Sequence, residues 1–313
     1  MLRKVLYIDL TRQESWVEER QELFESWMGG TGVGIRLLQE ECPPGTDPLS
    51  PEAPIILSIG PLNGVFPVAT KTAATFKSTL TGNLGESYAG GRLSLALRFA
   101  GHEALVIRGR AERPSYISIN DQEVRIKDAT SIWGVDAQTT GIILRDREPG
   151  VGRRSIIRIG PAGEAAVRFA CVMVDTYRHF GRLGLGAVFG SKNLKALVVA
   201  GTEHVDVPDI KRYKEVYNRL YKTAVQTEVM EKYHDIGTSA NISVLNWLRG
   251  LPTKNFLLSS FPEGDKIGGE VFAEKHLLRR FSCAGCPIGC VHIAALKTAF
   301  SEHHEFEVRR VSY

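Results

Sequence analysis

Three cysteines near the end of the chain, Cys283, Cys286 and Cys290, have the type and spacing that could do chemistry. They lie in the stretch FSCAGCPIGCVH and form a C-x2-C-x3-C array. Such short gaps let neighbouring thiolates converge on one centre from a loop or a helix start. Because soft sulfur ligands select zinc or iron–sulfur clusters, the array predicts a metal site.

Spacing alone leaves the fourth ligand of this site open. A cubane iron–sulfur cluster takes four cysteines, whereas zinc also accepts three cysteines and one histidine. His292, His303 and His304 are close enough in sequence for a zinc site. Cys42 lies among charged and turn residues, and Cys171 lies in the apolar run FACVMV, where a thiol usually packs in a strand. Iron–sulfur, zinc and unligated thiols therefore all stay open.

Two glycine-rich runs could bring backbone amides close to a phosphate or a ring. They are MGGTGVGIRLL and GRLGLGAVFGSKNLKA. The second run gives G-x-G-x-x-x-G, which is not the dinucleotide pattern, and tight turns explain a lone glycine run more often than ligands do. Arg178 and Arg182 flank Gly181. Paired arginines beside such backbone suit a phosphate-bearing ligand or, equally well, a solvated basic turn.

Composition narrows the class of protein to which this chemistry belongs. The chain has 313 residues, 43% of them hydrophobic and 24% charged, with a net charge of +4. So small a charge, without a basic run, disfavours nucleic acid as a partner. No window approaches the ~18 uninterrupted apolar residues of a membrane span, and no secretory signal is visible. The clustered cysteines indicate metal binding in a cytoplasmic protein rather than a disulfide framework.

Short strands joined by glycine turns must position these residues over the first 200 positions. Alternating or continuous apolar runs predict strands at 4–10, 53–60, 104–110 and 194–201, and on both sides of 160–163. Residues 115–128 read as a hairpin that turns at Asn120-Asp121. Helical spacing interrupts the strands at 34–41 and 93–100. The sequence shows no usable internal repeat.

The pattern changes near residue 205. From Asp209 to His234 the apolar residues recur at the spacing of an amphipathic helix, and Asp209 is a plausible N-cap after Pro208. The sequence therefore predicts a β-rich domain over 1–205 and the start of a helical domain over 206–313, an α+β chain overall.

An ordered series of motifs along the whole chain resembles one family, the aldehyde ferredoxin oxidoreductases, which are tungsten enzymes with two pyranopterin ligands on the metal. The series starts with YIDLT, WMGGTGVGIRLLQEECPPGTDPLSPEAPIILSIGPLNG, KSTLTG and AGG. It continues with LRFAGHEALVIRGRAERPSYISI, IWG, IGPAGE, RHFGRLGLGAVFGSKNLKALVVAG and CAGCPIGC. The run from Gly181 to Ala196 and the CxxCPxxC array are together very specific for this family.

The resemblance implies a fold and a set of cofactors. The fold is a β-rich, two-sheet base on which two pterins lie, followed by a helical domain. The cofactors are a tungsten (or molybdenum) bis-pyranopterin, a Mg²⁺ ion that bridges the pterin phosphates, and a [4Fe–4S] cluster. Cys283, Cys286 and Cys290 would supply three cluster ligands, and the fourth would come from a cysteine downstream of this sequence. We therefore expect a truncated chain or one that a partner chain completes.

The resemblance also implies which residues contact the pterins. Lys71 stands where the family has an arginine on a pterin phosphate, so the charge is kept and the bidentate fork is lost. Tyr88-Ala89-Gly90-Gly91 replaces the family's NSGG loop, and Arg178-His179-Phe180-Gly181-Arg182 replaces its RAAGR loop. The backbone carbonyls that hold Mg²⁺ would be those of Tyr88 and His179.

Glu307 is the catalytic candidate that the resemblance gives. The segment Glu305-Phe306-Glu307 matches an EYE segment whose second glutamate lies near the tungsten in the family. A carboxylate there would move a proton or activate water as an aldehyde carbonyl is attacked. The alternative is a surface glutamate in the charged tail SEHHEFEVRR.

The function implied is oxidation of a small aldehyde to the carboxylic acid, with electrons passing through the cluster to ferredoxin. The family's branch that reduces aromatic acyl-CoA thioesters is a close alternative. A non-catalytic scaffold that needs a partner chain, and a small zinc protein, are alternatives from other classes. Family members are often homodimers, which these residues do not address.

Overall fold

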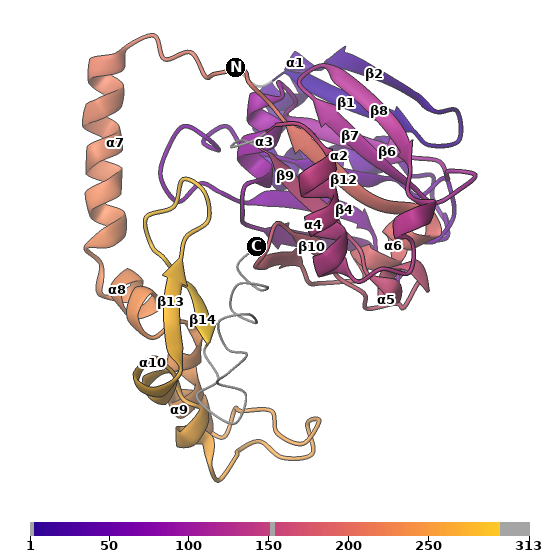
Figure 1. The fold of residues 1–313 in the computed structure, drawn as a ribbon. Coiled ribbons are helices and arrows are strands. Elements are labelled where there is room, and N and C mark those ends of the chain that lie inside the picture. Colours follow the sequence, from indigo (N-terminus) through magenta and orange to yellow (C-terminus); the bar gives the residue numbers. More distant parts are fainter. Residues whose placement is uncertain (1–2, 151–153, 295–313) are drawn as a thin grey trace. The chain divides into compact units, whose positions relative to one another are not determined.

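The structure is a computed structural model that describes residues 3–150 and 154–294. The chain divides into two units, Met1–Val207 and Pro208–Tyr313. Each unit has its own packing and is described by itself below (Figure 1).

The first sheet of the N-terminal unit has six strands in the order β2-β1-β6-β3-β4-β5. The strand bounds are β1 Lys4–Asp9, β2 Glu14–Glu19, β3 Ile55–Ser58, β4 Thr72–Lys77, β5 Leu84–Ala89 and β6 Ala104–Arg108. Strands β1 and β6 run parallel, and every other neighbouring pair is antiparallel. The central strands β1, β3 and β6 are buried on both faces, which explains their continuous apolar runs.

The second sheet also has six strands, in the order β11-β10-β9-β12-β7-β8. Their bounds are β7 Ser115–Asn120, β8 Glu123–Asp128, β9 Ser155–Arg158, β10 Val172–Val174, β11 Arg178–Phe180 and β12 Leu194–Ala200. The predicted hairpin is present, but its turn lies one residue later than predicted. Asn120 still pairs with Glu123, and Asp121 takes the left-handed backbone with φ 53°.

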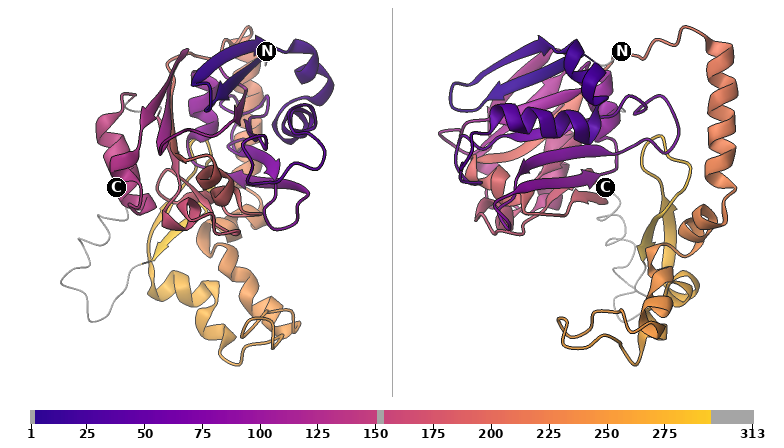
Figure 2. Two further views of the ribbon diagram at one scale, coloured as in Figure 1. Left: turned by 90° about the vertical axis from the view of Figure 1, so that its right-hand side faces the viewer. Right: turned by 180° about the vertical axis from the view of Figure 1, so that it is seen from behind.

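Helices cover the outer faces of both sheets, and the main core lies between the sheets (Figure 2). On the first sheet pack α1 Gln21–Trp27 and α2 Gly30–Glu41, and on the second packs α4 Ala137–Arg147. The core between the sheets includes apolar residues of α3 Leu93–Phe99 and α6 Leu185–Ser191. Short pieces η1 Thr130–Ile132 and α5 Pro161–Glu164 complete the unit. The helix predicted at 34–41 begins one turn earlier, at Gly30.

The two halves of the N-terminal unit repeat one plan. Strands β1 to β6 correspond in chain order and in sheet order to β7 to β12, since the second sheet reads β8-β7-β12-β9-β10-β11 from its hairpin edge. The pairing directions also match, with one parallel pair in each sheet, β1 with β6 and β7 with β12. Helices α2 and α4 lie outside their sheets at equivalent places, α3 and α6 lie in the core, and the outer helix α1 has no helical counterpart in the second half. The repeat lies in the topology, although the sequence reveals none.

Over residues 208–294 the C-terminal unit is mostly helical, with one small hairpin of two named strands. Its elements are α7 Ile210–Val225, α8 Glu228–Asp235, η2 Thr238–Ala240, α9 Asn241–Trp247, η3 Gly264–Ile267, α10 Gly269–Lys275, β13 Leu277–Phe281 and β14 Val291–Ala294. The Asp209 cap is confirmed, because its Oδ1 accepts the Arg212 amide at 2.9 Å. The single helix predicted to reach His234 is wrong, since Thr227 caps a second helix by accepting the Met230 amide.

None of the helices in residues 3–150 and 154–294 has the length and apolar character needed to cross a membrane.

Candidate functional site

Two loops that lead from a strand into a core helix hold most of the predicted pterin contacts. Tyr88 and Ala89 end β5, and Gly90 and Gly91 begin the connection to α3. Arg178 to Phe180 form β11, and Gly181 and Arg182 begin the connection to α6. In the repeated plan these loops occupy equivalent places. Strands β5 and β11 are edge strands of the two sheets and lie side by side, and the Arg182 amide donates to Ser87 Oγ at 3.2 Å. The fold thus brings the two predicted loops together.

Lys71 lies at the same end of the first sheet as the Tyr88 loop. It directly precedes Thr72, whose partner across the β4–β5 ladder is Ala89. The loop before Lys71 is held by Asn63, whose Nδ2 donates to the carbonyls of Ala69 at 3.1 Å and Lys71 at 3.0 Å. Asn63 belongs to the IGPLNG motif, and sequence reasoning missed its role because both acceptors are backbone carbonyls.

The Tyr88 side chain is tied to the first glycine-rich run. Its hydroxyl lies 3.0 Å from Thr31 Oγ1, at the start of α2, and donates to Glu86 Oε2 at 2.8 Å. Partial burial is the main cause of the raised pKa of this phenol, so the hydroxyl stays protonated at neutral pH. The ring is 42% exposed. An aromatic face therefore stands where the family's loop has an asparagine.

The charges around these loops favour an anionic ligand. The side chains of Lys71, Arg92, His179 and Arg182 are exposed or partly exposed, and Arg178 is half-buried on β11. Gly90 and Gly91 remove side-chain bulk beside them. The lysine and arginine side chains around these loops suit the phosphates of a pyranopterin.

The most specific motif residues, in contrast, lie in the core. Lys192 Nζ donates to the carbonyls of Pro51 at 3.0 Å and Gly109 at 3.1 Å, and burial lowers its pKa to about 8. Lys195 Nζ donates to Glu164 Oε1 and to the Val135 carbonyl, with 0% of the lysine side chain exposed. The GSKNLKA and IGPAGE motifs therefore stabilise the fold through one buried ion pair.

The three clustered cysteines lie between β13 and β14. Cys283 is buried, Cys286 is partly buried and Cys290 is exposed, and the Cys286 amide donates to the Cys283 carbonyl at 3.0 Å. Gly285 and Gly289, with φ of 78° and 67°, precede the second and third cysteines and allow the tight turns there. None of the five cysteines, all in the described part of the chain, forms a disulfide.

The thiols have the donor chemistry for a cluster but are not yet gathered around one point. Within residues 3–150 and 154–294, no group of three or more His, Cys, Asp or Glu side chains is placed to hold a metal ion. His292, a candidate zinc ligand, instead has Nε2 2.7 Å from the His234 carbonyl. His303, His304 and the catalytic candidate Glu307 lie outside the described residues.

The remaining cysteines are remote from this hairpin in sequence. Cys42 ends α2 and is partly buried. The prediction that Cys171 packs inside an apolar strand is wrong: it is exposed and lies just before β10, whose first residue is Val172. The core side of that strand is filled by Val172 and Val174 instead.

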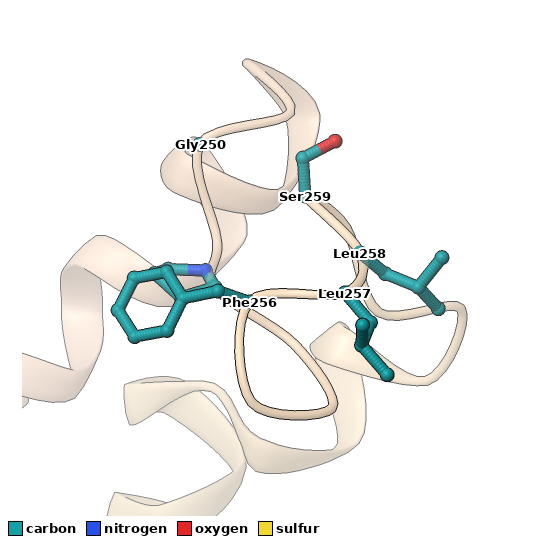
Figure 3. A pocket seen from close by; sticks show the side chains of 6 residues that line it. Gly250, Phe256, Leu257, Leu258 and Ser259 are labelled. Atoms are coloured by element: carbon teal, nitrogen blue, oxygen red, sulfur yellow. The ribbon is translucent and has the colours of Figure 1, made fainter.

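A surface pocket of the C-terminal unit is a different kind of site (Figure 3). It is lined by Gly250, Pro252, Phe256, Leu257, Leu258 and Ser259. Phe256 and Leu257 are 82% and 81% exposed, and no lining residue is titratable. This pocket offers apolar contact but no acid, base or metal ligand.

Comparison with solved structures first gives the fold class of the chain. The fold matches a chain of the "Active site complex BamBC of Benzoyl Coenzyme A reductase in complex with 1,5 Dienoyl-CoA", with a TM-score of 0.77 and 26% identity. The match covers 95% of this chain and 47% of that one. The predicted fold class, a β-rich two-sheet base followed by helices, is confirmed.

Family profiles then give the family. The profile described as "Aldehyde ferredoxin oxidoreductase, N-terminal domain" matches residues 5–201, and that described as "Aldehyde ferredoxin oxidoreductase, domains 2 & 3" matches residues 213–311. The chain belongs to the aldehyde ferredoxin oxidoreductase family, as its motifs predicted.

Similar proteins from one organism are named as oxidoreductases. A "Tungsten-containing aldehyde ferredoxin oxidoreductase" of Pyrococcus furiosus is 38% identical over 301 residues, which is 94% of this chain and 49% of the relative. An "Aliphatic sulfonate oxidoreductase, WOR-like subunit" of the same organism is 30% identical over 312 residues, again 94% and 49%. The chain spans about half the length of the curated relatives it matches.

Proposed function

We propose that the N-terminal unit is the base for a tungsten (or molybdenum) bis-pyranopterin cofactor. The observation that carries this proposal is the repeat: two equivalent strand-to-helix loops lie side by side at neighbouring sheet edges. A ligand made of two like halves on one metal suits a surface built from two like halves. The name of the tungsten-containing relative supports the choice of metal.

The phosphates would be held at the cationic rim of the two loops. Lys71 and Arg182 would pair with them, Arg178 would support the second loop, and backbone atoms at 90, 91 and 181 would contact the ligand. A Mg²⁺ ion would take the carbonyl oxygens of Tyr88 and His179. Oxygen donors of this kind are the ligands that Mg²⁺ prefers.

The cysteine hairpin would hold a [4Fe–4S] cluster. Cys283, Cys286 and Cys290 supply soft thiolate donors, and the two glycines before them allow the backbone to close around a ligand. Metal binding commonly completes the local fold of such a site. A fourth cysteine would come from additional polypeptide of the kind that the longer relatives contain.

The activity that these parts support is oxidation of a small aldehyde to its carboxylic acid, with electrons passed to a ferredoxin. The bound cofactor would supply the two-electron redox chemistry, while the chain's residues bind and orient it. Glu307 would hold or move a proton beside the substrate. A homodimer or a partner chain would complete the site, and reduced thiols suit a cytoplasmic setting.

A second candidate is an active-site subunit of an aromatic acyl-CoA reductase. The structural neighbour, a chain of a benzoyl coenzyme A reductase complex, favours it. Substrate tests would separate the candidates, because one oxidises an aldehyde and the other reduces a ring.

Metal analysis of anaerobically purified protein tests the proposal. We expect tungsten and about four iron atoms per chain, together with the broad visible absorption of an iron–sulfur cluster. Cys283→Ser should lose most of the iron, whereas Cys171→Ser, which changes an exposed thiol outside the hairpin, should keep it. Zinc in place of iron, or no metal, would overturn the proposal.

A further inference from the structure

The turn between β10 and β11 is hydrogen-bonded to the loop before α3, which belongs to the other half of the repeat. Asp175 is the turn residue, and its Oδ1 accepts from Ser155 Oγ at 2.8 Å and from the Ile156 amide at 3.2 Å. Its Oδ2 accepts from the Arg92 amide at 2.8 Å, at the entry to α3. One carboxylate therefore joins the second sheet to the first candidate cofactor loop.

The equivalent turn of the first half, between β4 and β5, does the same for the second loop. Ser78, which is fully buried, donates through Oγ to the Leu183 carbonyl at 3.1 Å, just before α6. Its neighbour Thr79 donates to the Arg168 carbonyl at 2.6 Å, and the Arg168 guanidinium donates back to the Thr79 carbonyl. The KSTLTG motif thus holds the GRLGLG motif.

Two glycines show how tightly each turn fits against the opposite loop. A Cβ on Gly91, which has φ +102°, would lie 2.8 Å from Asp175 Oδ2. A Cβ on Gly184, with φ +85°, would lie 2.0 Å from Thr79 Oγ1 and 2.1 Å from the Arg168 carbonyl oxygen. Each loop therefore needs glycine because a turn from the other half occupies the space beside it.

We propose that Asp175 and Ser78 are positioning residues that form a reciprocal brace and fix the separation of the two loops. The inference about the loops' ligand rests on the proposed function: two pterins on one metal require two binding loops at one fixed distance. Asp175 and Ser78 bind backbone atoms of the two loops. They act through the Arg92 amide and the Leu183 carbonyl, and a loop released from the brace would hold its pterin at a varying distance.

Hydrogen–deuterium exchange tests the brace without any bound cofactor. Asp175→Ala should speed exchange in residues 88–95 about tenfold, because the Arg92 amide loses its acceptor. Ser78→Ala should speed exchange around residues 181–187. The matched control is Ser118→Ala on β7, which lies away from β11 in the same sheet. It removes the buried 2.7 Å hydrogen bond that Ser118 Oγ donates to Glu148 Oε2. Unchanged exchange at 88–95 in Asp175→Ala, or an equal rise in Ser118→Ala, would overturn the brace.

A second variant keeps the test decisive if Asp175→Ala does not fold. Gly91→Ala leaves the carboxylate in place and pushes the loop away from it, so exchange at 88–95 should again rise. Gly134→Ala is its control, because Gly134 has a similar φ of +86° but open space around it. If Gly91→Ala exchanges no faster at 88–95 than Gly134→Ala, the brace is overturned.

The tungsten content of the purified protein tests whether Asp175 positions a cofactor loop. A residue that only stabilised the fold would not change the tungsten content of the folded chain. We expect Asp175→Ala to lose most of its tungsten per folded chain and keep its iron, while Ser118→Ala keeps both. Tungsten retained at the wild-type level in Asp175→Ala would overturn the positioning role. If the wild type itself binds no tungsten, the proposed function fails, and the exchange experiment still decides the brace.

Discussion

The two units of this chain contain two different kinds of site. In the N-terminal unit the candidate loops are fixed by strand register, by side chains that bind backbone atoms, and by glycines with no room for a Cβ. In the C-terminal unit three thiols of the right type follow one another in a hairpin, but they are not gathered around a point in the described residues. The residues of the first candidate site are therefore held by contacts of the fold, whereas those of the second are held mainly by the turns of one hairpin.

Burial explains why the two candidate sites are held so differently. The strands beside the loops share a core between two sheets, whereas α7, α8 and α9 of the C-terminal unit bury no residue. A site can be held to a fixed geometry only where buried contacts restrain the backbone that carries it. The comparison thus predicts that single substitutions in the N-terminal core cost far more stability than similar ones on the surface of the other unit.

Lys195→Met should lower the stability of the protein most, because it leaves the buried Glu164 carboxylate without its cation. We expect the free energy of unfolding of the N-terminal unit to fall by about 3–5 kcal/mol, measured by guanidinium denaturation. Lys266→Met is the matched control, since its pair with Glu263 is 73% and 59% exposed and contributes at most about 1 kcal/mol. Equal losses in the two variants would remove the contrast between the units.

Gly184→Ala should have the next largest effect. Its Cβ would collide with the Arg168 carbonyl and Thr79 Oγ1, in a backbone conformation that already disfavours a side chain. We expect a loss of about 3 kcal/mol in the free energy of unfolding. Gly134→Ala, with the same kind of φ and open space, should lose only about 1 kcal/mol. Thermal unfolding of the two variants measures the difference, and similar midpoints would show that crowding is not the cause.

Lys192 should have the smallest effect on stability, seen as a pH dependence of the free energy of unfolding. Burial lowers the pKa of its amino group from 10.5 to about 8, so between these values the folded state binds fewer protons than the unfolded state. The free energy of unfolding should therefore rise with pH, by about 1–3 kcal/mol between pH 8 and 10. Lys192→Met should remove this rise, and Lys266→Met should keep it. A rise that persists in Lys192→Met would assign it to another group.

The sequence predicted the parts of the fold that depend on local pattern. Apolar runs located the central strands, and the turn signal at Asp121 located the β7–β8 hairpin to within one residue. The spacing of the three clustered cysteines predicts a metal site, which stays a prediction. The motif series identified the family, because its long glycine and lysine run admits few alternatives.

What the sequence could not predict depends on contacts between distant residues. Asp175 and Ser78 bind backbone atoms of the opposite half, and a backbone partner leaves no mark in the sequence. Lys192 and Lys195 look like solvated charges, yet they are buried against carbonyls and one carboxylate. The break before α8 was missed because the apolar spacing continues past it, while Thr227 supplies a cap that competes with helix continuation.

The reciprocal brace has a consequence for how these sequences can change over time. Position 91 shares its space with the carboxylate at 175, and position 184 shares its space with the hydroxyl at 79. A larger residue at either glycine is tolerable only if the opposing turn retreats, so each pair must be inherited as a unit. The constraint is strongest where one half lies within reach of the other.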